Sequence, residues 1–263
     1  MIGKPLEGRT AVVTGAGKGI GMGIAQHLAA AGAAVVIDYS FSEAGAIKVR
    51  DGIIAEGGKA MIFKADVSKE EEVVALMKAA VDWTGRLDIL VNNAALQANV
   101  TFPDYKMETY DSLINVNLGG YFMCIREAAK YMIPEKRGFI LCVSSVHAKR
   151  PTEFDPTYCM TKGGIKMLER EAAVELAPHN IRVVCVEPGG VRLEAPKSGN
   201  EGEIVSRKLY EQERLFPYKR YSPIAGRGMY PSDVGQMAVL LATDDCELIT
   251  GTEVGMDRGD MLY

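Results

Sequence analysis

The sequence predicts an α/β fold in which helices cover both faces of a parallel, doubly wound sheet. Short apolar runs of strand length alternate with amphipathic stretches of helix length almost to the end of the chain. The apolar runs lack a regular apolar–polar alternation, as expected of strands that are buried on both faces. Strict alternation of strands and helices is typical of a parallel sheet built from β–α–β units.

Each predicted element follows from a local pattern. Seven runs rich in aliphatic residues have strand length, and they cover residues 10–14, 34–38, 60–65, 87–91, 139–143, 181–186 and 252–256. In the first helical segment, Ile20, Ile24 and Leu28 recur every four residues on one face. The helical segments lie near residues 19–31, 42–57, 69–84, 107–134, 155–178 and 231–243. We therefore expect a seven-stranded, mostly parallel sheet.

The segment 190–230 departs from this alternation. It is rich in Pro, Gly, Arg and Lys and carries one plausible helix, at about 201–215. A connection of this length in a compact domain is usually a functional lid or binding loop. We expect one domain over residues 1–263, with a substrate lid at about 190–230. Its basic residues could attract an anionic substrate, but glutamates are interspersed, which favours a solvated helix surface.

Composition narrows the classes of function. The chain has 263 residues, of which 48% are apolar and 24% charged, as is typical of a globular domain. A net charge of −4 gives no electrostatic reason to expect a nucleic-acid or membrane partner. Five scattered cysteines and three distant histidines predict neither a disulfide framework nor a metal site. We expect a cytoplasmic protein with a small-molecule substrate.

A glycine-rich turn follows the first strand and opens the first helix. It reads Thr14-Gly15-Ala-Gly17-Lys18-Gly19-Ile20-Gly21. Glycines permit a tight turn and a close approach to the backbone, and the free N–H groups of a helix N-terminus can bind a pyrophosphate. Such spacings also occur in simple strand-to-helix turns, but in this context the turn predicts a dinucleotide site.

Polar residues follow three other strands, and the carboxyl ends of parallel strands meet at one ligand-binding edge. These positions include Asp38, Asp66 and Asn93. Taken singly, each residue also suits a turn or a helix cap. Asp38 could bind an adenosine ribose and select NAD, whereas Lys18 could meet the 2′-phosphate of NADP. The residues alone leave this choice open.

A tyrosine, a lysine and a serine suggest proton-transfer chemistry. In Tyr158-Cys-Met-Thr-Lys162 the two side chains are four residues apart and share one face of a helix. Ser145 ends a predicted strand thirteen residues upstream. An ammonium ~4 Å from a phenol stabilises the phenolate by roughly 4 kcal/mol, which would lower the phenol pKa from ~10 to about 7. Such a group can exchange a proton while an alcohol and a carbonyl interconvert.

Taken together, these residues closely resemble the short-chain dehydrogenase/reductase family over essentially the whole chain. The shared motifs occur in family order: the glycine turn, Asn92-Asn93-Ala94, Asn117-Leu-Gly-Gly120, Ser145, Tyr158-Cys-Met-Thr-Lys162 and Pro188-Gly189. The resemblance implies a single Rossmann-like domain and an NAD(P)-dependent interconversion of a secondary alcohol with a ketone or lactone. It also implies a homotetramer built partly on the helices near 107–134 and 155–178.

The resemblance further implies a role for each motif residue. Tyr158 is the general acid/base, Ser145 orients the reacting oxygen, and Lys162 lowers the pKa of Tyr158 and holds the nicotinamide ribose. Asn117 holds a water that links Lys162 to solvent. The residues expected at the cofactor are Gly15, Gly17, Lys18, Gly19, Ile20, Gly21, Asp38, Asp66, Val67, Asn93, Ala94, Tyr158, Lys162, Pro188, Gly189 and Val191. The expected substrate contacts are Gln97, Ser145, His147 and Tyr158.

Within the family, Ser144-Ser145-Val146-His147 and the C-terminal end look most like sugar dehydrogenases of the glucose 1-dehydrogenase type. This favours a sugar, a polyol or another polar alcohol as substrate. Two alternatives stay open: a reductase of a more apolar ketone, such as a 3-oxoacyl thioester or a steroid, and a nucleotide-binding protein that has lost the chemistry.

Some positions depart from the family pattern or have a simpler interpretation. Tyr39 stands where the NAD-selecting acid generally falls, and together with Lys18 this favours NADP over NAD. Asp38 would oppose the phosphate by repulsion. The charged residues between Ser145 and Tyr158 are Arg150, Glu153 and Asp155, and they could contact a substrate or be mere loop charge; loop charge is the favoured interpretation for most of them.

Overall fold

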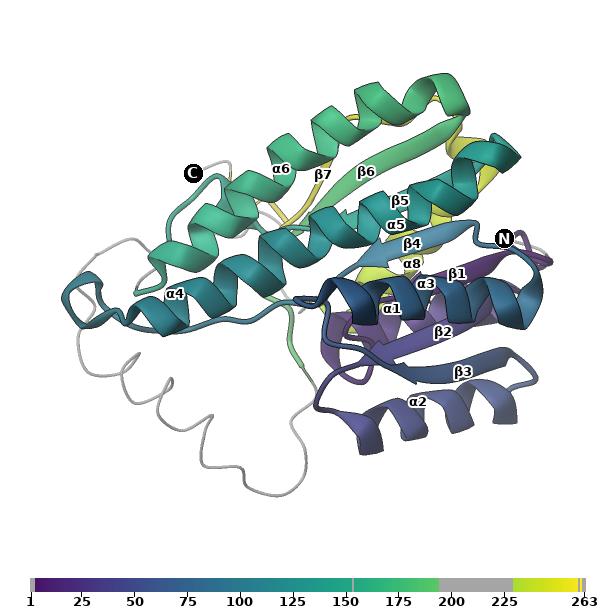
Figure 1. Cartoon of the computed structure of the whole chain (residues 1–263), viewed down its shortest axis with the longest axis horizontal. Coiled ribbons are helices and arrows are strands. Elements are labelled where there is room, and N and C mark those ends of the chain that lie inside the picture. Colours follow the sequence, from purple (N-terminus) through teal and green to yellow (C-terminus); the bar gives the residue numbers. More distant parts are fainter. Residues whose placement is uncertain (1–2, 153, 194–228, 260, 262–263) are drawn as a thin grey trace.

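The computed structural model describes residues 3–152, 154–193, 229–259 and 261. The helix predicted at about 201–215, and most of the segment 190–230 expected to form a lid, lie outside the described residues. The elements within the described ranges alternate between strand and helix as predicted (Figure 1).

Seven strands form one sheet, and every neighbouring pair is parallel. The strands are β1 (Thr10–Val13), β2 (Ala34–Tyr39), β3 (Lys59–Lys64), β4 (Ile89–Asn92), β5 (Gly138–Val143), β6 (Ile181–Pro188) and β7 (Glu253–Met256). Their order in the sheet is β3-β2-β1-β4-β5-β6-β7. This confirms the doubly wound architecture. The order reverses direction between β1 and β4.

Helices cover both faces of the sheet (Figure 1). They are α1 (Gly19–Ala30), α2 (Glu43–Ala55), α3 (Glu70–Thr84), α4 (Met107–Ile114), α5 (Gly120–Glu135), α6 (Pro156–Leu176) and α8 (Pro231–Ala242). Short helical turns are η1 (Phe102–Asp104), η2 (Asn115–Gly119), η3 (Val146–Ala148), η4 (Ala177–His179) and η5 (Asp244–Cys246).

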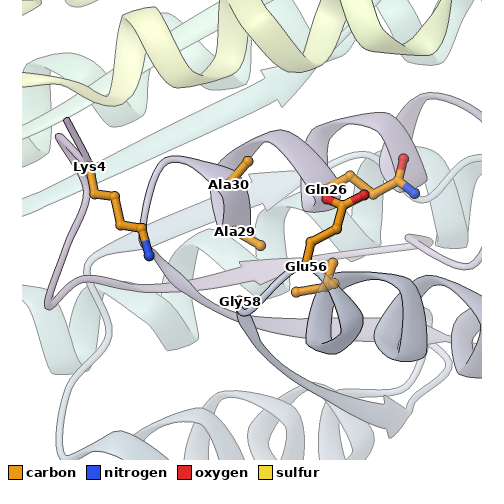
Figure 2. Close-up of a pocket in the computed structure, with 7 residues that line it drawn as sticks. Lys4, Gln26, Ala29, Ala30, Glu56 and Gly58 are labelled. Atoms are coloured by element: carbon orange, nitrogen blue, oxygen red, sulfur yellow. The ribbon is translucent and has the colours of Figure 1, made fainter. Parts of the chain in front are cut away.

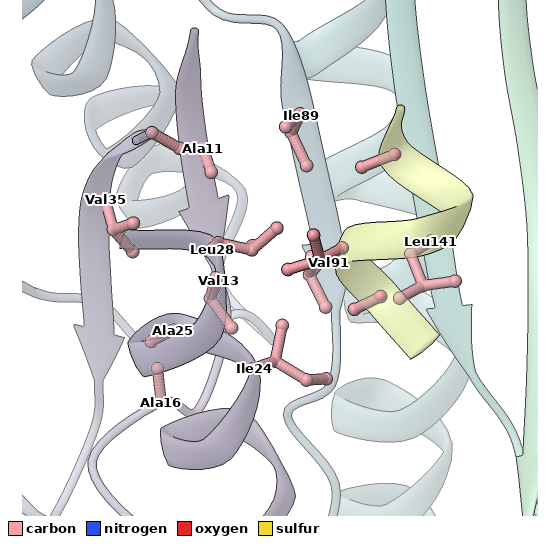
Figure 3. Close-up of a cluster of buried hydrophobic side chains, with 14 of the residues drawn as sticks. Ala11, Val13, Ala16, Ile24, Ala25, Leu28, Val35, Ile89, Val91 and Leu141 are labelled. Carbon is pink, nitrogen blue, oxygen red and sulfur yellow. The ribbon is translucent and has the colours of Figure 1, made fainter. Parts of the chain in front are cut away.

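Successive residues of the strands face opposite sides, and this divides the apolar core into two clusters. On β1, Val13 belongs to the cluster under α1, α2 and α8, whereas Val12 belongs to the cluster under α3, α5 and α6. Figure 3 shows the first cluster, in which Ile24 and Leu28 of α1 point toward Val91 of β4. Burial on both faces explains why the strands read as continuous apolar runs.

Helices α1 and α8 approach so closely that glycines are required at the contact. A Cβ atom at Gly23 would lie 2.4 Å from the Pro231 carbonyl oxygen, and one at Gly235 would lie 2.4 Å from the Gly23 carbonyl oxygen. Both distances are well inside van der Waals contact. The backbones of these helices therefore pack directly against each other.

The helix predicted over 107–134 is interrupted. The structure has α4, then the π-helical turn η2, and then α5. Such turns insert an extra residue into a helix and are frequent at functional sites. The interruption places Asn117 in the turn, where its side chain is fully buried.

Candidate active site

The candidate site lies along the carboxyl edge of the sheet, beside the point where the strand order reverses. In open α/β sheets ligands bind outside the carboxyl ends of the strands, at this reversal. Here Asn93, directly after β4, bonds to the turn that follows β1. Its Nδ2 donates to the Thr14 carbonyl at 2.8 Å, and its backbone N–H donates to Thr14 Oγ1 at 2.9 Å. Asn93 thus joins the two halves of the sheet below the site.

The glycine turn leaves no space for a side chain at Gly21. A Cβ atom there would lie 2.5 Å from Asn93 Nδ2 and 2.7 Å from the Gly15 carbonyl oxygen. Lys18 is exposed directly before α1 and adopts an extended backbone. The turn therefore packs closely against Asn93 at the start of α1.

The start of α1 fits an anionic group. Among the described residues no side chain caps this helix, and its first turn contains no acidic residue. By contrast, α3 carries Glu70, Glu71 and Glu72 in its first turn. Unpaired N–H groups and the positive end of the helix dipole favour a negative charge. The residues present therefore suit the pyrophosphate of a dinucleotide.

Asp38 lies buried at the end of β2 and supports the turn. Its Oδ2 accepts a hydrogen bond from the Gly15 backbone N–H at 3.1 Å, while Oδ1 has no partner. Burial raises the pKa of this carboxyl to about 7, against the lowering effect of the backbone hydrogen bonds. The raised pKa means that Asp38 is more readily protonated near neutral pH than an exposed carboxyl.

The other residues expected at the cofactor lie along the same edge. Asp66 follows β3 and accepts hydrogen bonds at Oδ1 from the backbone N–H and the hydroxyl of Ser68. Val67 is buried. Pro188 ends β6, and the Gly189 N–H donates to the Met256 carbonyl at 2.8 Å. Val191 pairs with Met229 in an isolated parallel bridge.

Ser145, Tyr158 and His147 come together at the end of β5. The side chains of Ser145 and Tyr158 are hydrogen-bonded. Ser145 Oγ also accepts from the His147 backbone N–H at 3.1 Å. The His147 ring meets the Tyr158 ring edge-on, with 6.3 Å between centroids and 66° between planes. Strand β5 and helix α6 thus place two hydroxyls and an imidazole in one group.

Lys162 lies one turn further along α6 and is almost completely buried. Its Nζ donates to the Val143 carbonyl at 2.7 Å and lies between two aromatic rings, 5.4 Å from the centroid of Tyr158 and 5.5 Å from that of Tyr121. Burial lowers the pKa of this ammonium from 10.5 to about 8. The rings and the carbonyl are the groups that stabilise the cation. Tyr121 was not identified from the sequence, where nothing distinguishes it from an ordinary core tyrosine.

The pKa of Tyr158 differs from the sequence-based expectation. We expected Lys162 to lower it, but burial raises it above its usual value of 10, and the hydrogen bond from Ser145 opposes this only in part. The physical reason is that Lys162 directs its hydrogen bond to the backbone of β5 rather than to the phenol oxygen. In this structure Tyr158 is a neutral proton donor at neutral pH.

Asn117 connects the π-helical turn to the loop that follows β4. Its Oδ1 accepts from the Leu96 N–H at 2.7 Å, and its Nδ2 donates to the Leu96 carbonyl at 2.9 Å. Nδ2 also lies 3.2 Å from Thr161 Oγ1, on α6 beside Lys162. The amide therefore donates two hydrogen bonds and accepts one, and it holds the loop against α6.

Asp155 corrects one interpretation of the sequence, because it is a buried helix cap and not mere loop charge. It is fully buried and caps α6, accepting at Oδ1 from the Tyr158 N–H at 3.1 Å. Oδ2 accepts from the Ala98 N–H at 3.0 Å, and the side chain of Gln97 adds a third bond. The sequence did carry a signal, since Asp before Pro156 is a typical helix start.

Other features lie apart from this edge. A cavity of about 150 Å³ opens between α1 and α2 at the opposite end of the sheet, with Lys4, Gln26 and Glu56 around alanine methyl groups (Figure 2). In the described ranges no cluster of three His, Cys, Asp or Glu side chains is arranged to hold a metal ion. No helix in the described part of the chain has the length and apolar character to cross a bilayer.

Comparison with known proteins shows which family this chain belongs to. A model of the family described as short chain dehydrogenase matches residues 9–203. The chain belongs to the short chain dehydrogenase family. Enzymes of this family are oxidoreductases that use nicotinamide nucleotides and act on small molecules, so this short chain dehydrogenase is an enzyme of that class. The resemblance inferred from its motifs is confirmed.

Relatives of this short chain dehydrogenase differ in the substrates that their names indicate. It is 32% identical over 262 residues to glucose 1-dehydrogenase 2 of Bacillus subtilis, covering 99% of this chain and 97% of the relative. It is 35% identical over 259 residues to 3beta-hydroxysteroid dehydrogenase 1 of Eggerthella lenta, covering 98% and 95%. The crystal structure of gox2181 superposes with a TM-score of 0.87 at 28% identity, covering 98% and 97%.

Proposed function

We propose that this enzyme interconverts a secondary alcohol and a ketone or lactone, with a polar alcohol such as a sugar or polyol as substrate. The observation that carries the proposal is the group formed by Ser145, Tyr158 and Lys162 beside a dinucleotide-binding turn. A nicotinamide cofactor supplies the hydride chemistry when bound. The protein then has to bind the substrate, orient its oxygen and move one proton.

The side chains divide these tasks. Tyr158, neutral in this structure, donates a proton to the substrate oxygen as a carbonyl is reduced, and accepts one in the reverse direction. Ser145 hydrogen-bonds the same oxygen and holds it near the phenol. Lys162 carries the positive charge of the site and would hold the nicotinamide ribose. Asn117 anchors the surrounding loop, and we assign its turn to the proton relay that links Lys162 to solvent.

We infer NADP rather than NAD as the preferred cofactor. Lys18 is exposed at the start of α1, where a 2′-phosphate would gain a cationic partner. Tyr39, at the position that often carries an acid in NAD-dependent relatives, donates its hydroxyl to Glu43 at 3.1 Å. Asp38 is buried with a pKa raised to about 7, so that it repels a phosphate less than an exposed, fully ionised carboxylate would.

The polar-substrate assignment is supported by two hydrogen-bonding side chains near the start of α6. The His147 ring contacts Tyr158, and Gln97 bonds to Asp155, which caps the helix at Tyr158; both side chains can bind hydroxyl groups. The similarity to glucose 1-dehydrogenase 2 agrees with this. The second candidate is a more apolar ketone, and the observation that favours it is the 35% identity to a 3beta-hydroxysteroid dehydrogenase, against 32% to glucose 1-dehydrogenase 2.

We further infer that the enzyme is a cytoplasmic homo-oligomer with α6 at a subunit interface. Three apolar side chains recur every seven residues on this helix and are exposed: Met160, Met167 and Val174, with exposed fractions of 53%, 64% and 73%. Phe122 on α5 is also half exposed. A stripe of this spacing is typical of helix-to-helix packing between subunits.

The testing experiment compares wild type with Tyr158→Phe. NADPH and NADH binding is titrated first, and a panel of D-glucose, sorbitol, 2,3-butanediol, 2-octanol and the corresponding carbonyl compounds is then screened with the preferred cofactor. We expect turnover of Tyr158→Phe to fall at least ~100-fold while cofactor affinity is kept. Unchanged turnover would remove Tyr158 from the reaction. Preference for 2-octanol over the sugars would favour the apolar-ketone candidate, and silence with tight cofactor binding would favour a non-catalytic protein.

A further inference from the structure

The loop that follows β4, residues 94–100, is tied to the catalytic helix through a buried carboxylate. Asp155 has no exposed surface, and its two oxygens accept backbone hydrogen bonds from different segments of the chain. Oδ1 accepts from the Tyr158 N–H, in the first turn of α6. Oδ2 accepts from the Ala98 N–H, in the loop. One side chain thus bridges two segments that lie 57 residues apart.

This arrangement exceeds what a helix cap needs. Capping requires one oxygen that accepts from an N–H of the first turn, and Ser, Thr or Asn supplies it as well as Asp does. A buried carboxylate is costly unless its oxygens are satisfied. Asp155 satisfies its second oxygen with the loop, and it adds a bond from the side chain of Gln97. The choice of Asp at this position is therefore explained by the loop.

Neighbouring contacts hold the same loop on both sides of Ala98. Leu96 exchanges two hydrogen bonds with the side chain of Asn117, at 2.7 and 2.9 Å. The Val100 N–H donates to the Phe154 carbonyl at 2.6 Å. Between these two contacts, the bonds to Asp155 determine where Gln97 lies relative to Tyr158.

We propose that Asp155 is a positioning residue that fixes Gln97 relative to Tyr158, so that a substrate contacts both side chains at once. Because an ionised carboxylate only accepts hydrogen bonds, the amide NH₂ of Gln97 must be the donor to Asp155. The carbonyl oxygen of Gln97 is then left to accept from a ligand. This orientation matches a substrate that carries a second hydroxyl group near the reacting carbon, and the inference rests on the proposed function.

The test uses the full-length protein and the variant Asp155→Asn. Asn still caps a helix well, but it has one acceptor oxygen, so its NH₂ group must face one of the two backbone N–H groups. In hydrogen-exchange measurements we expect exchange across residues 96–100 to rise at least ~10-fold while the first turn of α6 changes much less. With D-glucose, sorbitol or 2,3-butanediol, whichever is turned over best, KM should rise at least ~5-fold, kcat less, and NADPH affinity should be unchanged.

Two further variants separate positioning from general destabilisation. Asp88→Asn alters a buried Asp at the opposite edge of the sheet, where Oδ2 accepts from the Thr10 N–H at 2.8 Å. It should lower the melting temperature without changing KM or exchange at 96–100. Gln97→Ala, at an exposed position, should raise KM for the same polyol while the melting temperature stays that of the wild type.

These experiments distinguish failure of the Asp155 proposal from failure of the proposed function. If Asp155→Asn melts earlier but exchange at Ala98 and KM are both unchanged, Asp155 is only a cap and the proposal is wrong. If KM is unchanged in Gln97→Ala, the claim that substrates contact Gln97 is wrong. A wild-type protein that binds no NADPH and turns over no compound would overturn the proposed function. Exchange at Ala98 would then still decide whether Asp155 tethers the loop.

Discussion

Lys162 Nζ lies over the Tyr158 ring, 5.4 Å from its centre, and gives its hydrogen bond to the Val143 carbonyl rather than to the Tyr158 hydroxyl. The lysine gives its short hydrogen bond to the Val143 carbonyl, and Tyr121 donates to the same oxygen at 2.9 Å. The hydrogen bond to the Tyr158 hydroxyl comes from Ser145. Because burial outweighs that bond, the phenol pKa is raised, and the protonated form of Tyr158 predominates at neutral pH.

The first prediction concerns the pH dependence of the two reaction directions. Carbonyl reduction requires a protonated Tyr158 and alcohol oxidation a deprotonated one. Since the pKa of Tyr158 is raised, kcat/KM for oxidation should increase across roughly pH 6 to 10, whereas kcat/KM for reduction should not increase over this range. Initial rates in both directions with one substrate pair check this. An oxidation rate that is flat across the range would contradict a proton-accepting role for Tyr158.

The second prediction concerns Lys162→Met. The pKa of Lys162 is lowered to about 8, so the native state disfavours the charged lysine by roughly 3 kcal/mol relative to the unfolded chain. This penalty is complete below pH 8 and disappears as the pH rises toward 10.5. Met fills similar space without the charge. Because the ammonium is lost, turnover should fall at least ~100-fold. Because the penalty for burying the charge is also lost, the free energy of unfolding at pH 6 should stay equal to or above that of wild type.

Urea unfolding at pH 6 and pH 10 provides the measurement. Any gain in stability of Lys162→Met over wild type should be larger at pH 6 than at pH 10. A variant that is clearly less stable than wild type at pH 6 would show that the hydrogen bond to Val143 and the two ring contacts outweigh the burial penalty.

The third prediction separates two glycines. Gly21→Ala places a methyl group 2.5 Å from Asn93 Nδ2 and 2.7 Å from a backbone oxygen, so the glycine turn must shift. NADPH affinity should fall at least ~10-fold, since the turn shapes the phosphate site. The matched control is Gly52→Ala in α2, where nothing lies within 4 Å of the added Cβ. This control should stabilise the protein by roughly 0.5–1 kcal/mol and leave NADPH affinity unchanged.

The fourth prediction concerns the apolar stripe on α6. Met167 is 64% exposed and lies at the centre of the stripe, so Met167→Glu should place a charge in the inferred interface. Sedimentation equilibrium should show a smaller assembly for this variant than for wild type. Trp83→Glu on α3, at a 39% exposed apolar position outside the stripe, is the control and should leave the assembly state unchanged. A monomeric wild type would refute the interface.

The local pattern of apolar residues was sufficient to locate the strands and most of the helices. All seven strands were located within a few residues, because burial on both faces makes each one a short apolar run between turns. The break in the helix predicted over 107–134 was missed. Its cause is not local: the π-helical turn is held by bonds from Asn117 to Leu96, 21 residues earlier in the chain. The spacing of apolar residues within 107–134 carries no information about a partner outside that segment, such as Leu96.

The site was predictable in composition but not in its electrostatics. Ser145, Tyr158 and Lys162 were found from their spacing, and the structure brings them together. Their pKa values depend on burial and on the partner of each hydrogen bond. The spacing of the residues in the sequence reveals neither of these. Asp155 shows a different limit: the helix-start signal was present, but only the tertiary structure reveals that the same carboxylate reaches the loop at Ala98.

The backbone contact between Gly23 and Gly235 has a consequence for how the protein is made. The two glycines are more than 200 residues apart, so α1 leaves the ribosome long before the helix that covers it is synthesised. Until then the side of α1 that carries Gly23 and packs against α8 has no partner in the nascent chain. Contacts this distant in sequence form slowly and leave partly folded chains open to aggregation. Chaperone dependence during translation is the expected result, and truncation before α8 should yield insoluble protein.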